Sequence, residues 1–294
     1  MSTLKNKIDF AVVINVKNAN PNGDPLNGNR PRTNYDGLGE ISDVCIKRKI
    51  RNRLMDAKLP IFVQSDDNKV DGYNSLRERA EKELKGGLNR KDACAKWLDV
   101  RAFGQVFAFK NKDKAKGKKS ESEEGIDQTE NSVSIGIRGP VSIHSAFSVN
   151  SVSVSSIQIT KSVSGEGDGT KKASDTMGMK HRIDHGVYVF YGSMNPQLAS
   201  LTGFSDEDAA AIKEALRTLF QNDSSSARPE GSMEVYKLYW WKHAVNIPNG
   251  QYSSAKVHRS LKITPRNDSP KDIIDYEISL EKLDGLEPEV IDGQ

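Results

Sequence analysis

The chain has 294 residues, a net charge of +3 at neutral pH, and 36% hydrophobic and 28% charged residues. This composition predicts a soluble globular protein of one large domain or two small ones. The sequence has neither an apolar run long enough to span a membrane nor a signal-peptide stretch, so we expect a cytoplasmic protein. The two cysteines, Cys45 and Cys94, lack metal-site spacing and fit a reducing compartment.

The first predicted elements are a strand and a long loop. Residues 8–17 place apolar side chains at every second position from Ile8 to Val16, which is the period of a β-strand. The loop that follows begins NANPNGDP and is rich in Asn, Gly and Pro, which form turns. Its length exceeds that of ordinary connections and favours a functional role.

A basic helix follows the loop. Ser42 or Asp43 is placed to cap it, and apolar residues recur at the helical period: Ile46, Ile50, Leu54 and Ala57. The rest is mostly basic, with six cations: Lys47, Arg48, Lys49, Arg51, Arg53 and Lys58. Because acidic partners along the helix are scarce, we expect this row of cations to follow a phosphate backbone. A solvated surface helix is the alternative.

The middle of the chain predicts short helices, strands and two polar segments. We expect helices over 74–84 and 90–98, and strands over 133–144, 151–160 and 187–192, the first broken at Gly139-Pro140. Residues 110–130 form a low-complexity stretch with a basic and an acidic half, which predicts an exposed, disordered loop. A second flexible segment is expected over 165–186.

The last third predicts one more helix and several strands. Ser205 and Asp208 resemble a capping box before a helix that uses Ile212, Ala215, Leu216 and Leu219. Strands are expected over 233–244, 254–264 and 273–283. The order strand, helix, strands, helix, strands has no sustained βα alternation, so we expect an α+β fold with a ferredoxin-like sheet and long insertions.

Two further segments have the composition of nucleic-acid contacts. In the loop after the first strand, glycines let the backbone approach a ligand, and Asn20, Asn22 and Arg30 can contact phosphate or sugar. The segment 165–186 alternates cations with Met177 and Met179, which can act as apolar wedges between bases. The alternative for the first segment is an elaborate turn without a binding role, and the alternative for the second is a mobile loop.

No motif indicates catalysis or a cofactor. The sequence lacks GxSxG, GxxxxGK[ST] and GxGxxG. His181 and His185 have a zinc-binding spacing only if they lie on a helix, which no pattern supports. Asp24 stands alone, whereas oxygen-ligand metal sites use several carboxylates. We therefore expect no catalytic residue, metal or cofactor.

Several segments resemble a known family. NANPNGDP followed by DVCIKRKIRNRL resembles the Cascade backbone subunit of type I-C CRISPR systems, the Cas-seven family of the RAMP superfamily. IGIRGPVSIHSAFSVNSV, TMGMKHRIDHGVYVFYG and GFSDEDAAAIKEALRTLFQND are similar to later segments of that family, and the resemblance covers about residues 8–280. It implies one domain over 1–294 with an RNA-recognition-motif palm, a finger insertion over about 86–132 and a thumb-type β arm over about 150–186.

The resemblance also implies a function without catalysis. Copies of such a subunit stack head to tail along a guide RNA, shield its backbone and leave its bases free to pair with target DNA, while each thumb displaces a base. The implied partners are the guide RNA, the target DNA strand, further copies, other Cascade subunits and a recruited helicase-nuclease, with no membrane. Base pairing then reads sequence while protein holds the backbone.

The resemblance assigns RNA-contact roles by position. They fall on the loop, the basic helix, the strand before Gly139 and the arm: Asn20, Asn22, Arg30, Lys47, Arg48, Lys49, Arg51, Arg53, Arg138, Lys171, Lys172, Met177, Met179, Lys180, His181 and Arg182. Two enzymatic alternatives stay open. Related type III subunits cut target RNA with a loop aspartate, for which Asp24 is the candidate and Asp43 the second. A guide-processing ribonuclease would use His181 or His185.

Overall fold

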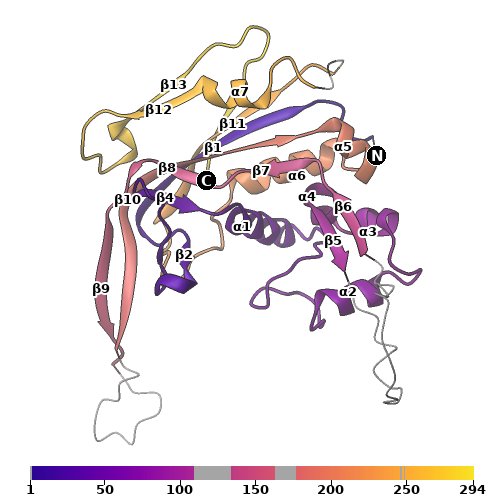
Figure 1. The fold of residues 1–294 in the computed structure, drawn as a ribbon, viewed down its shortest axis with the longest axis horizontal. Helices are drawn as coiled ribbons and strands as arrows, with labels where there is room; N and C mark the ends of the chain where they lie inside the picture. The colour runs from indigo at the N-terminus through magenta and orange to yellow at the C-terminus, as the bar shows by residue number, and fades with distance from the viewer. Residues whose placement is uncertain (1, 109–133, 163–176, 246, 248) are drawn as a thin grey trace, which may run out of the picture.

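The computed structural model describes residues 2–108, 134–162, 177–245, 247 and 249–294. Its centre is an antiparallel sheet with strand order β14–β11–β1–β10–β8–β4, drawn in Figure 1. These strands are β1 (Ile8–Ala19), β4 (Leu38–Ile41), β8 (Ala146–Ser151), β10 (Met177–Met194), β11 (Met233–Lys242) and β14 (Glu289–Asp292). The expected α+β class is confirmed. No described helix combines the length and apolarity needed to cross a membrane.

β1 lies at the centre of the sheet because both of its faces are apolar. Phe10, Val12 and Ile14 are buried on one face, and Ala11 and Val13 are buried on the other. The strand pairs with β10 on one side and with β11 on the other. The order β11–β1–β10–β8, with helices after β1 and β10, is the connectivity expected of a ferredoxin-like sheet.

One face of the sheet is covered by helices. These are α1 (Asp43–Asp56), α5 (Pro196–Thr202) and α6 (Asp206–Arg217), whose apolar sides join the main core with β1 and β10. Ser42 caps α1 by accepting the Cys45 N–H, and the capping box of Ser205 with Asp208 is present. Both predicted helix starts are therefore confirmed.

The other face carries a C-terminal layer. It consists of α7 (Ser254–Ser260), β12 (Leu261–Pro265), a 3-10 turn (Ile273–Asp275) and β13 (Tyr276–Leu280), and it packs on Ala11, Val13 and Trp241. The predicted strand over 254–264 is wrong in its first half, because Ser253 caps a helical turn by accepting the Lys256 N–H. The strand predicted over 273–283 begins only at Tyr276.

The layer is anchored by a buried polar group. Asp9 of β1 is fully buried and accepts from His243 Nε2 at 2.8 Å, while the Lys7 ammonium lies 3.2 Å from the same oxygen. Burial raises the pKa of Asp9, but the bonds from His243 and Ser254 outweigh it and the net pKa is lowered. The charged carboxylate is therefore paired, as buried charges require.

A module with its own small core lies at one end of the sheet. It contains α2 (Leu76–Glu83), α3 (Arg90–Lys96), α4 (Leu98–Phe103), β5 (Gly104–Ala108) and β6 (Ser134–Arg138), packed around Phe62, Trp97 and Phe107. The helices expected over 74–84 and 90–98 are confirmed in outline. After Gly139-Pro140 the chain continues as β7 (Val141–Ile143), which pairs with β10. The low-complexity stretch 110–130 lies outside the described residues.

A two-stranded arm extends from the opposite end of the sheet (Figure 1). It is formed by β9 (Val154–Thr160) and the first part of β10. The flexible segment expected over 165–186 is thus wrong for 177–186, because these residues alternate in register with β9 and continue directly into the sheet. Beside the arm, β2 (Gly23–Asp24), a 3-10 turn (Pro25–Asn27) and β3 (Arg30–Pro31) form the long loop.

Candidate nucleic-acid interface

The arm presents apolar side chains on both of its faces. Met177 pairs with Thr160, and Met179 with Gln158, so the two methionines share one face. They are 67% and 54% exposed. The other face carries Ile157 and Ile159, opposite Lys180 and Gly178. Sequence reasoning identified the methionines but missed the two isoleucines, although the alternation in SSIQIT could have revealed them.

This exposure is unusual for a free strand pair. The arm spans roughly 17 Å from Met177 to Arg182 at the normal rise per residue, and there β10 pairs with β9 alone. An isolated two-stranded ribbon is marginally stable in water. The exposed apolar residues therefore make the arm a candidate surface for a partner.

The base of the arm is tied to the long loop through one hydroxyl group. Ser156 Oγ lies 2.8 Å from His181 Nδ1 and accepts from Arg30 Nη1 at 3.3 Å. His181 is buried, whereas Arg30 is exposed. The loop and the arm, far apart in sequence, thus form one continuous surface in which Arg30 is an accessible cation.

The two predicted loop asparagines have structural partners. Asn20 is buried and donates to the Asn29 carbonyl at 2.7 Å. Asn22 Oδ1 accepts both from the Ser42 backbone N–H at 2.9 Å and from the Ser42 hydroxyl at 3.0 Å. Asn22 thereby connects the loop to the start of α1. Their amides serve the loop conformation, and their expected contact with RNA stays a prediction.

Helix α1 differs most from expectation. Four of its cations pair with acidic side chains: Lys47 with Asp43, Lys49 with Asp223, Arg51 with Asp99 and Arg53 with Asp56. The idea of a row of free cations is therefore wrong. Asp43 is an i,i+4 partner within the helix, and Asp99 and Asp223 come from distant segments that helix-local reasoning cannot find. Arg48 is exposed on this helix.

The comparisons with known proteins agree with this architecture. The sequence model of the family described as "CRISPR-associated protein Cas7" matches residues 6–281. The chain belongs to this family. A curated Haloferax volcanii relative, also named "CRISPR-associated protein Cas7", is 29% identical over 239 residues, which is 77% of this chain and 67% of that protein.

Two solved structures are also similar to this Cas7-family chain. A chain of a "CRISPR RNA-guided surveillance complex, pre-nicking" gives a TM-score of 0.46 at 16% identity, covering 81% of this chain and 78% of that one. A chain of a "CRISPR RNA-guided surveillance complex" gives 0.40 at 17% identity, covering 81% and 70%.

Two arginines of this Cas7-family chain have buried donors without acceptors. The Nε atoms of Arg32 and Arg182 are buried and have no hydrogen-bond partner among the described residues. Arg32 lies at the end of the long loop and makes a weak 3.4 Å contact to Asp24, and Arg182 lies on the arm. An unsatisfied guanidinium donor is costly, and phosphate is an acceptor of matching geometry.

The remaining predicted residues are dispersed. Arg138 is exposed at the end of β6, and Figure 1 places β6 at the end of the molecule opposite the arm. Lys180 is half-buried on the isoleucine face of the arm. Lys171 and Lys172 lie outside the described residues. The structure thus joins Arg30, Ser156 and the arm, and it does not join Arg138 to them.

The histidine and aspartate candidates have other partners. His181 and His185 lie four residues apart on one strand, about 13 Å at the rise of a strand, too far to bind one metal. His185 contacts Asn15 and the Pro270 carbonyl, and burial lowers its pKa. Asp24 Oδ1 accepts the Leu26 N–H as a turn cap. Within the described residues, no group of three His, Cys, Asp or Glu side chains could hold a metal.

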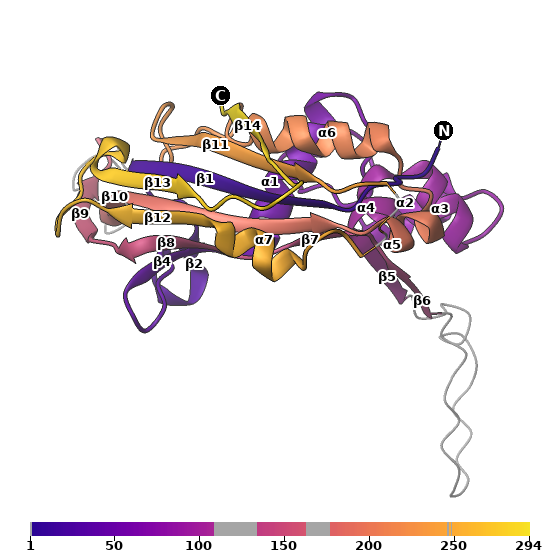
Figure 2. The same cartoon turned by 90° about the horizontal axis from the view of Figure 1, so that it is seen from above.

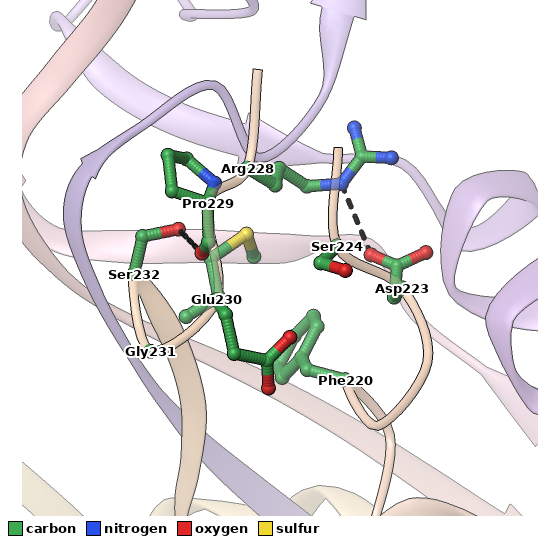
Figure 3. Close-up of a pocket in the computed structure, with 9 residues that line it drawn as sticks. Phe220, Asp223, Ser224, Arg228, Pro229, Glu230, Gly231 and Ser232 are labelled. Atoms are coloured by element: carbon green, nitrogen blue, oxygen red, sulfur yellow. Dashed lines mark hydrogen bonds and ion pairs between the residues drawn. The ribbon is translucent and has the colours of Figure 1, made fainter. Parts of the chain in front are cut away.

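A small pocket near α1 is too small for a nucleotide. Figure 3 shows it between Phe220, Arg228 and Glu230, with Arg228 donating to Asp223. Its volume of about 20 Å³ has room for about one water molecule. This pocket therefore does not provide a substrate site.

Proposed function

We propose that this chain is a guide-RNA-binding backbone subunit of a type I-C CRISPR surveillance complex, and that it has no catalytic role of its own. Several copies bind along one guide RNA, hold its backbone and leave its bases free for the target DNA strand. Other Cascade subunits, and a recruited helicase-nuclease, complete the assembly. The subtype rests on the NANPNGDP and DVCIKRKIRNRL segments.

The arm is the observation that carries this proposal. It combines Met177 and Met179, with more than half of each side chain exposed, and a base at which Arg30 and His181 meet on Ser156. Apolar side chains on a strand ribbon can enter between nucleobases while nearby cations hold phosphates. Such an arm displaces a base whatever its identity, which is what a sequence-independent coat requires.

The cations for the phosphates are fewer than the sequence predicts. Arg30 and Arg48 are exposed, and the buried donors of Arg32 and Arg182 lack acceptors among the described residues. The proposal therefore assigns phosphate contacts to exposed Arg30 and Arg48, with half-buried Arg32 and Arg182 as further candidates. Lys49 is excluded from direct contact, because its side chain is only 1% exposed and is paired with Asp223.

The proposal is tested by titrating the purified chain with labelled single-stranded RNAs of guide length and unrelated sequences. We expect similar affinities for all of them and complexes that contain several protein copies. Binding of one sequence alone, or of a single copy however long the RNA, would overturn the proposal.

The metal-dependent ribonuclease is the alternative function. Its candidate Asp24 is bonded to Leu26 and Arg32. Guide-loaded chain incubated with complementary RNA and magnesium should leave that RNA intact. Cuts at regular spacing that vanish in Asp24→Asn would establish the ribonuclease instead. Unchanged precursor RNA would likewise exclude guide processing by His181 or His185.

A further inference from the structure

A groove lies on the face of the sheet opposite α1 and α6. The C-terminal layer covers only part of this face, and Figure 2 shows β12 running alongside β10 and β8. The groove between β12 and β8 has a volume of about 550 Å³, which is within the range of binding sites for small ligands. Buried Val189 and Leu261 line it.

Aromatic rings line the groove at fixed positions. Phe147 of β8 stands opposite Val189 of β10 in the sheet register and is 40% exposed. Tyr191 lies two residues further along β10, on the same face, and stacks on His258 with ring centroids 4.9 Å apart. Exposed His144 meets His258 edge to face. Aromatic side chains on an open sheet face are stacking surfaces for nucleobases.

Positive charge borders the groove on the β12 side. The stretch 254–266, SAKVHRSLKITPR, has no acidic residue and four exposed cations: Lys256, Arg259, Lys262 and Arg266. Lys262 lines the groove and lies 3.6 Å from Glu281, but both side chains are more than 60% exposed, so that pair is weak. On the far side of the groove, Glu40 pairs with Phe147 in the sheet register. Because Glu40 is negatively charged, an anion in the groove is favoured on the β12 side.

A peptide strand fits this groove less well. The Arg266 N–H donates to the Asp275 carbonyl, and the Glu281 N–H donates to the Ser260 carbonyl. These bonds flank the pairing of β12 with β13 and set the register in which Leu261, Ile263 and Pro265 face the open edge of β12. Pro265 has no N–H, and the Leu261 N–H is bonded to His258. Within β12, all of whose residues are described, this leaves the Ile263 N–H as the donor for an added strand. Strand addition needs a longer row of backbone donors.

We propose that the groove binds a single-stranded nucleic acid other than the guide RNA. A base lies against Phe147 and Tyr191, and the neighbouring phosphates lie at Arg259 and Lys262. This site uses the face of the sheet opposite the helices and shares no residue with the arm.

The test uses the full chain, both alone and loaded with guide-length RNA. Fluorescein-labelled 12-mers of oligo(dT) and oligo(rU), not complementary to the guide, are titrated and followed by anisotropy. We expect Arg259→Glu with Lys262→Glu to weaken 12-mer binding at least about tenfold and to flatten its salt dependence. Phe147→Ser should weaken it about fivefold or more. The ratio of dT to rU affinity identifies DNA or RNA as the ligand.

Matched controls separate this site from general electrostatics and from the guide site. Lys82→Glu with Lys85→Glu removes the same charge from exposed positions elsewhere, and Leu201→Ser removes an apolar side chain that is 65% exposed. Both should bind the 12-mers normally. Met177→Thr with Met179→Thr should alter the guide complex and leave 12-mer binding to the guide-loaded chain unchanged, so the two proposals can fail separately.

A crosslinking readout covers the case in which the Phe147 variant is unstable. The 12-mer with 5-iodouracil, irradiated on the unmodified chain, should crosslink within residues 144–149 or 189–191. Equal loss of affinity in both charge-reversed variants, or crosslinks confined to the arm, would overturn the proposal. So would saturable binding of an apolar peptide that the 12-mers cannot displace.

Discussion

Lys49 of α1 and Asp223 of the loop after α6 form an ion pair inside the protein. The Lys49 side chain is 1% exposed, and the same Asp223 oxygen accepts from Arg228 Nε at 3.0 Å. Burial lowers the pKa of Lys49, while Asp223 opposes that shift. This cation therefore holds α1 to the loop after α6 and is not available to a ligand.

Replacing Asp223 by Asn should destabilise the fold strongly. The substitution leaves the Lys49 ammonium buried without its counter-ion, which typically costs about 3–5 kcal/mol. Chemical denaturation followed by circular dichroism measures the free energy of unfolding. As a control, Asp292→Asn removes a carboxylate that is 81% exposed and pairs with Lys237; it should cost less than about 1 kcal/mol. Equal effects of the two variants would contradict the burial argument.

The Asp223→Asn defect should also shrink at high pH. Without Asp223 the folded-state pKa of Lys49 falls further, while the unfolded value stays near 10.4. At pH values between these two pKa values, the unfolded state binds more protons than the folded state, so the stability of the variant rises with pH. We expect the gap between variant and parent to narrow from pH 7 to pH 10. A constant gap would mean that Lys49 stays charged throughout.

Two arginines of α1 should behave differently on substitution. Arg48 is exposed, so Arg48→Glu should keep the melting temperature and weaken RNA binding of any sequence. Arg51 donates to buried Asp99 at 2.9 Å, and Arg51→Gln should cost about 2–4 kcal/mol because it leaves a buried carboxylate less compensated. Differential scanning fluorimetry and filter binding separate the effects. Loss of RNA binding in a fully stable Arg51→Gln protein would instead support the hypothesis that a row of cations on α1 contacts phosphates.

The two faces of the arm should differ in base displacement. Met177→Thr with Met179→Thr keeps the strand propensity and should reduce the fluorescence of 2-aminopurine placed in the bound RNA. Ile157→Thr with Ile159→Thr changes the opposite face of the same ribbon and serves as the matched control. An effect of the isoleucine pair alone would assign base displacement to the other face.

Arg30 should contribute to RNA affinity without stabilising the fold. It is exposed, and its bond to Ser156 is long at 3.3 Å, so Arg30→Ala should change the free energy of unfolding by less than about 0.5 kcal/mol. It should weaken RNA binding severalfold and reduce the salt slope by about 0.7, as for one single-strand phosphate. Lys5→Ala, an exposed cation elsewhere, is the control. An unchanged salt slope would remove Arg30 from the interface.

The sequence predicts the parts of this fold that depend on local patterns. The alternation of 8–17 places β1, and the caps at Ser42 and Ser205 place two helices. The Gly139-Pro140 break separates β6 from β7. These features need only near neighbours in sequence.

Several of the misses depend on distant partners. Two of the four ion pairs of α1 use Asp99 and Asp223, which lie 48 and 174 residues from their partners. The arm at 177–186 forms a strand because β9 pairs with it across an intervening segment. The bond of Asn22 to Ser42, 20 residues away, was likewise not predicted, and the expected contact of Asn22 with RNA stays a prediction. The composition of a segment predicts its local structure, but it does not identify the distant segment that pairs with it.

The most direct test of the central claim is the mass of the complex as the RNA lengthens. Native mass spectrometry of the purified chain with single-stranded RNAs of increasing length and unrelated sequences counts the bound copies. We predict one further copy for each fixed increment of RNA length, the same for every sequence, and disrupted regular spacing in the Met177→Thr with Met179→Thr protein. A copy number independent of RNA length, or binding confined to one sequence, would contradict a guide-RNA backbone subunit.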